Sequence, residues 1–144
     1  MPFAYDATGI DPDMSFPVLE GKKWYSYEIM ETEAKKNKSG NNMVVCKVKC
    51  ITKGFEGVGG TIYHYVSFPP KGEKGAGIGV HFLKAIGEPF EGELDIDEFA
   101  WLTKRFDGYT IVEEYEGKKR NKITQVEAYQ HWDSDEVKEG ETPF

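Results

Sequence analysis

Cysteine is scarce in this sequence, with only Cys46 and Cys50 among 144 residues. On an extended strand their Cα atoms would lie roughly 13 Å apart, at about 3.3 Å per residue, which is beyond the reach of a disulfide. A zinc site would need a turn between the two and a second pair of ligands elsewhere, and the sequence offers neither. We therefore expect two buried thiols, with no metal and no other cofactor.

Long apolar runs are also missing. No stretch approaches the eighteen or so residues that a membrane-spanning helix needs. The first residues, Met1–Asp6, lack the basic start and apolar stretch of a signal peptide. With 30% charged residues and a mean hydropathy of -0.57, the chain is expected to be a soluble, cytoplasmic protein with one main domain.

Recognisable catalytic motifs are absent as well. Asp95, Asp97 and Glu98 could be considered as ligands of a metal-dependent nuclease, but acids at that spacing are better explained as the start of a helix. No serine or cysteine lies in a nucleophile context, and the glycine-rich stretch 53–60 has no Gly-Lys-Ser/Thr after it. The three histidines are scattered along the chain: His64, His81 and His131. The sequence therefore predicts a protein that is not an enzyme.

Charge is segregated along the chain, although the net charge is -7. Residues 22–72 carry nine Lys and four Glu, and residues 104–124 carry six basic and four acidic residues, whereas the ends and the middle are acidic. Because salt screens charges beyond about 10 Å, a nearby polyanion responds to the local field and not to the net charge. The two basic segments are therefore candidate binding regions.

Residues 43–51 and 61–68 alternate in the manner of two β-strands. In the first strand Val44, Cys46, Val48 and Cys50 share the predicted core face, and the other face carries Lys47 and Lys49. In the second strand Tyr63 and Tyr65 point outward, whereas His64 falls on the apolar face and is expected to be a core histidine. Lysines for phosphates and flat rings for bases are what a single-stranded nucleic acid site requires. The alternative is an ordinary sheet with a solvated face.

The whole chain predicts a five-stranded barrel. Strands are expected at 22–32, 43–51, 61–68, 108–115 and 121–129. A polar turn is expected at 33–42, and a helix over 80–86 closed by Gly87. A second helix should begin near Asp95 and bury Phe99, Trp101 and Leu102. This succession is that of an OB-fold, a Greek-key barrel with a helical connection between strands three and four. The domain would span residues 21–131, between an N-terminal arm (1–20) and an acidic, disordered C-terminal tail (132–144).

An OB-fold binds oligonucleotides on the face of strands two and three and on the loops that join strands one to two and four to five. Both of these loops are basic here. The residues predicted to bind nucleic acid are therefore Trp24, Lys35, Lys36, Lys38, Lys47, Lys49, Tyr63, Tyr65, Tyr115, Lys118, Lys119, Arg120 and Lys122.

Two motifs carry a resemblance to a known family: the turn Lys38-Ser-Gly-Asn41 and the hairpin Tyr115-x-Gly-Lys-x-Arg-Asn121, within residues 20–130. In these motifs, and in stretches such as Lys23–Ile29, the chain resembles phage-encoded OB-fold proteins, long classed as of unknown function, some of which bind single-stranded DNA. The resemblance implies single-stranded DNA binding in phage replication or recombination, in the host cytoplasm. The alternative is an OB-fold module for protein interaction or virion structure that does not bind nucleic acid.

The C-terminus is acidic and ends in Pro143-Phe144. It is similar to the acidic tip with which bacterial single-strand-binding proteins recruit replication and repair proteins, although it lacks a run of Asp before the Pro-Phe. The resemblance implies that Pro143 and Phe144 bind such a partner. An acidic tail without a function is the equal alternative.

Overall fold

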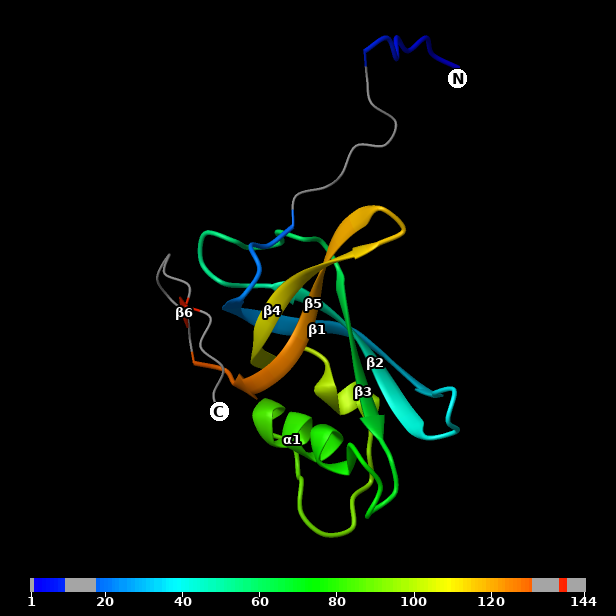
Figure 1. The fold of residues 1–144 in the computed structure, drawn as a ribbon, viewed down its shortest axis with the longest axis vertical. Coiled ribbons are helices and arrows are strands. Elements are labelled where there is room, and N and C mark those ends of the chain that lie inside the picture. Colours follow the sequence, from blue (N-terminus) through cyan, green and yellow to red (C-terminus); the bar gives the residue numbers. More distant parts are fainter. Residues whose placement is uncertain (1, 10–17, 131–137, 140–144) are drawn as a thin grey trace.

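The computed structural model describes residues 2–9, 18–130 and 138–139. Five antiparallel strands form a nearly closed barrel: β1 (Lys23–Lys36), β2 (Asn42–Cys50), β3 (Ile62–Phe68), β4 (Arg105–Tyr115) and β5 (Lys118–Ala128). Their order is β3-β2-β1-β4-β5, so β3 and β5 stand at the two edges, where the barrel is not sealed by a hydrogen-bonded ladder (Figure 1). With one helix between β3 and β4, this is the predicted OB-like fold.

The long first strand joins the two halves of the barrel because it pairs with both β2 and β4. Its start pairs with β4 over Lys23–Glu28, and its later part pairs with β2 over Tyr27–Lys36. The register with β2 shifts between Ile29 and Glu31, so Met30 forms a bulge, and bulges bend a strand and increase its twist. The short strand β6 (Lys138–Glu139) pairs with the start of β1.

The helix α1 (Ala76–Ile86) covers one end of the barrel (Figure 1). It packs so closely on β3 that a Cβ on Gly79 would lie 2.7 Å from the Phe68 ring and from the Ser67 carbonyl oxygen. The helix ends as predicted at Gly87, which is left-handed with φ 81°. It begins four residues before the predicted start.

The second predicted helix is a single 3-10 turn, η1 (Glu98–Trp101). Its N-cap is Asp97 and not Asp95, and the Asp97 carboxylate accepts a hydrogen bond from the Phe99 N–H. Only Trp101 is buried, whereas Phe99 is 67% exposed and Leu102 is 38% exposed. The prediction that all three would be buried was therefore wrong, because so short a turn buries one side of itself only.

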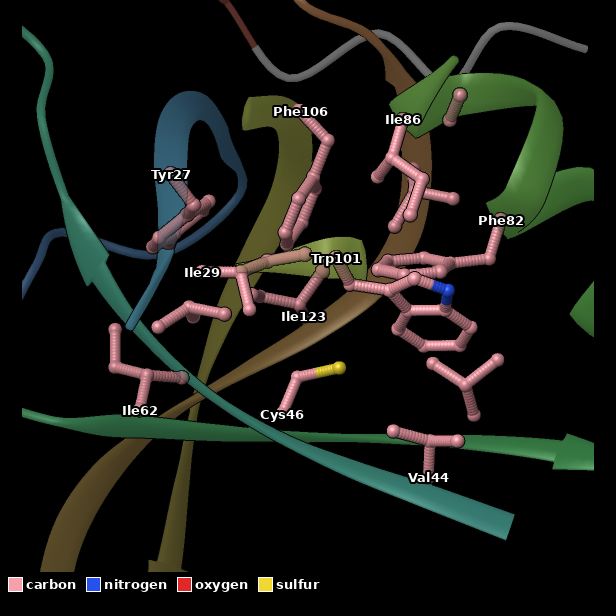
Figure 2. Packing of buried hydrophobic residues seen from close by; sticks show 14 of the residues in the cluster. Tyr27, Ile29, Val44, Cys46, Ile62, Phe82, Ile86, Trp101, Phe106 and Ile123 are labelled. Carbon is pink, nitrogen blue, oxygen red and sulfur yellow. The ribbon is translucent and has the colours of Figure 1, made fainter. Parts of the chain in front are cut away.

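The core fills the barrel with side chains from the strands, from α1 and from η1 (Figure 2). The predicted inner face of β2 is confirmed, because Val44, Cys46, Val48 and Cys50 are all buried. Both cysteines are free thiols, and burial raises the pKa of Cys46 to about 12.

Three strands extend further than predicted. β1 continues to Lys36, so Lys35 and Lys36 lie on the strand, and only Lys38 lies in the turn. β4 begins at Arg105, and β5 begins directly after the turn Glu116-Gly117. The β4–β5 ribbon extends beyond the barrel at one end of the molecule. The β1–β2 turn projects from a different part of the barrel, so the two basic turns are not side by side (Figure 1). Pro143 and Phe144 lie outside the described residues.

Within the described ranges, the helices are too short and too polar for any of them to cross a membrane.

Candidate nucleic-acid interface

A cleft of about 640 Å³ follows the unsealed seam between β3 and β5. We call it the hairpin cleft, because the β4–β5 hairpin forms one of its walls. It brings together predicted site residues that are more than fifty positions apart in the sequence. Among its lining residues are Tyr63 and Tyr65 from β3, and Glu113, Lys118, Lys119, Arg120 and Lys122 from the hairpin.

The two tyrosines stand on the outer face of β3, as the alternation predicted. Tyr63 is 50% exposed and Tyr65 is 56% exposed, so each ring has surface free for contact. Between them His64 points inward, with its ring centroid 5.3 Å from that of Phe82. Burial lowers the pKa of His64 to about 4, so its ring is neutral at pH 7. His64 therefore lies on the inner face of β3 as predicted, but it is half-buried and also lines the cleft.

The hairpin gives the cleft its positive charge. Among the described residues, Lys118, Lys119 and Lys122 are exposed and form no ion pair. Arg120 is already engaged, because its Nε donates to Glu113 Oε1 at 2.6 Å and its guanidinium lies 4.4 Å from the centroid of the Tyr115 ring. Tyr115 is 55% exposed, with one face covered by this guanidinium.

A second hollow, of about 510 Å³, lies on the other side of the tyrosines. We call it the Phe99 hollow. It is lined by Tyr63 and Tyr65 from β3, Val45 and Lys47 from β2, five residues of β1 (Met30, Glu31, Thr32, Glu33 and Lys35), and Phe99 and Leu102 at η1. The tyrosines therefore form a ridge with a cavity on each side.

The predicted cations on β1 and β2 do not line the hairpin cleft, and one of them, Lys47, is already paired. Lys47 forms an ion pair with Glu31 at 3.0 Å, and the hydrogen bond to this carboxylate raises the pKa of Lys47. Lys49 is exposed and lies opposite Glu28 in the β1–β2 register. Lys36 and Lys38 are exposed and line neither of the two cavities.

Trp24 was wrongly predicted as a stacking platform. It is only 3% exposed, and its ring packs edge-on against Tyr109 of β4 with centroids 5.6 Å apart. It lies at a point of β1 that pairs with Tyr109 of β4 and with Lys138 of β6. A base has no access to this ring.

The end of the N-terminal arm, at Leu19, is held beside the hairpin cleft by a contact that sequence reasoning missed. The Asn121 side-chain amide bonds both backbone groups of Leu19: Oδ1 accepts from the Leu19 N–H at 2.8 Å, and Nδ2 donates to the Leu19 carbonyl at 2.9 Å. Leu19 is buried, and the neighbouring Val18 lines the cleft. The sequence shows only that an asparagine lies within a predicted strand, and this does not reveal that its side chain bonds Leu19.

Among residues 2–9, 18–130 and 138–139, no three His, Cys, Asp or Glu side chains are grouped closely enough to hold a metal ion. Comparison with protein-family models and with curated proteins finds no match to this chain.

Proposed function

We propose that the chain is a single-stranded nucleic acid binding protein, whose site is the hairpin cleft and the Tyr63–Tyr65 ridge beside it. The observation that carries the proposal is the composition of this one cleft. Four cations face a single carboxylate, that of Glu113, directly beside two half-exposed tyrosine rings. Cations that follow a backbone and rings on which bases stack are the two elements that bind single strands without reading their sequence.

The geometry favours an unpaired strand over a duplex. The rings stand on the barrel surface beside a cleft, and a base can lie flat on them only if it is not paired and stacked within a helix. Every base has a π-face, so binding by this mechanism tolerates any sequence. We propose DNA as the ligand because of the resemblance to phage single-stranded DNA-binding proteins, and with it a role in replication or recombination.

The test is a fluorescence anisotropy titration of labelled oligo-dT and of a duplex of equal length, at two salt concentrations. The single strand should bind more tightly than the duplex. The logarithm of its binding constant should fall with the logarithm of salt concentration, by about 0.7 for each phosphate neutralised. Absence of binding at low salt would refute the proposal.

A protein-interaction module is the second candidate, and the Phe99 hollow favours it. Exposed apolar side chains that gather in one place often mark a protein interface. Phe99, Met30 and Leu102 gather in this way. Such a module would leave oligo-dT unbound in the titration above.

We further propose that the acidic C-terminus recruits a replication or recombination protein through Pro143 and Phe144. Removing the last twelve residues should abolish recruitment and leave DNA affinity equal or higher, because acids compete with phosphates for cations. A clear loss of DNA affinity after this truncation would contradict that role.

A further inference from the structure

The two cavities beside the tyrosine ridge differ in charge. The hairpin cleft has four cations against one carboxylate. The Phe99 hollow has two of each, Lys35 and Lys47 against Glu31 and Glu33, and Lys47 is held by Glu31 at 3.0 Å. Phosphates should therefore be attracted to the hairpin side of the ridge and not to the other.

The Phe99 hollow combines these paired charges with exposed apolar side chains. Met30 is 45% exposed, Phe99 is 67% exposed and Leu102 is 38% exposed. Val45 faces outward between the two walls, yet it is only 6% exposed, so neighbouring side chains shield the floor of the hollow. Tyr65 and Glu33 lie on opposite sides of Val45, two strands apart, which is roughly 9.6 Å at about 4.8 Å per strand. A flat, largely apolar group fits this space better than a phosphate does.

Glu33 gives the hollow a specific hydrogen-bonding character. Its side chain is exposed, and among the described residues it has no hydrogen-bond or ion-pair partner, whereas the neighbouring Glu31 is occupied by Lys47. A carboxylate accepts hydrogen bonds and donates none. Cytosine, adenine and guanine carry exocyclic amino groups that donate. Thymine has no amino group, and its one donor, the N3–H, lies between two carbonyl oxygens that a carboxylate repels.

We propose that a bound strand lies along the tyrosine ridge with its phosphates in the hairpin cleft, and that one base crosses the ridge into the Phe99 hollow. There the base contacts Phe99, and an amino group of the base donates a hydrogen bond to Glu33. The hollow is thus a base subsite that favours amino-bearing bases over thymine. This inference rests on the proposed function, and it adds a preference that stacking on Tyr63 and Tyr65 alone would not produce.

The test compares oligo-dT with oligo-dC of the same length by anisotropy titration. The parent chain should bind oligo-dC about fivefold to tenfold more tightly, the preference that one charged hydrogen bond gives. Glu33→Ala should bring the ratio of the two affinities close to one. Glu114→Ala is the matched control, because it removes an exposed carboxylate from the hairpin and should leave the ratio unchanged.

Phe99→Ala should weaken oligo-dC binding about fivefold or more, through loss of the ring contact. Equal binding of oligo-dT and oligo-dC by the parent, or an unchanged ratio in Glu33→Ala, would refute the subsite while leaving the proposed function intact. If neither oligonucleotide binds, the proposed function fails and the subsite fails with it.

Discussion

Replacing both Tyr63 and Tyr65 with alanine should weaken oligo-dT binding by at least about thirtyfold. Each ring is about half exposed and can hold one base. Stacking of a base on an aromatic side chain contributes about 1–3 kcal/mol, so two rings contribute at least about 2 kcal/mol, and about 1.4 kcal/mol corresponds to a tenfold change.

The same double substitution should leave the barrel folded. Half of each ring is already in water, so little buried area is lost. Replacing Tyr63 also removes the cation–π interaction with the Lys47 ammonium, which lies 5.9 Å from the centroid of the ring. Such an interaction contributes about 0.5–1 kcal/mol at an exposed site. A small domain typically has about 5–15 kcal/mol of stability, which exceeds these losses.

The assay combines anisotropy titration with urea unfolding followed by circular dichroism. Tyr5→Ala is the control, because this ring is 74% exposed and belongs to the N-terminal arm. It should bind oligo-dT as the parent does. A double variant that unfolds cooperatively and still binds within twofold of the parent would show that the tyrosine ridge is not the platform.

Three further substitutions test the surroundings of the site. If the Lys119 ammonium neutralises one phosphate, Lys119→Ala should reduce the slope of log affinity against log salt concentration by about 0.7. An unchanged slope would show that Lys119 contacts no phosphate. Gly59→Ala should lower the urea midpoint more than Gly57→Ala. Both glycines have positive φ, but only at Gly59 would a Cβ lie 2.8 Å from the Asn121 Oδ1, and equal midpoints would contradict this. His64 has its pKa lowered to about 4 from 6.5, so the unfolded chain takes up the proton first as pH falls. Stability should therefore drop by about 2 kcal/mol between pH 7 and pH 5, and His64→Leu should show a smaller drop; an equal drop in both would contradict the assignment.

The faces of β2 and β3 could be predicted from the sequence because side chains alternate strictly along a strand. This rule placed Tyr63 and Tyr65 outside and Cys46 inside, and the structure confirms both. The same rule could not predict that Trp24 is buried. Alternation indicates the face on which a side chain lies, but it does not reveal that Tyr109 of a distant strand covers that face.

Other features depend on pairings that no local pattern contains. Glu31 neutralises Lys47 only because the bulge at Met30 sets their register. The Asn121 amide meets Leu19 across 102 positions of the chain. Phe99 is exposed because η1 is one short turn, whereas its apolar neighbours suggested a longer, buried helix. The Phe99 hollow depends on the β1–β2 register and on the short η1, so sequence reasoning could not find it.

The most direct test of the central claim is an NMR titration of the chain, labelled in its tyrosine rings, with an oligo-dT single strand. The ring signals of Tyr63 and Tyr65 should shift as the strand binds, whereas those of Tyr25 and Tyr27, which are buried in the core, should stay in place. Saturable binding that leaves the Tyr63 and Tyr65 signals unmoved would place the strand elsewhere and contradict the account.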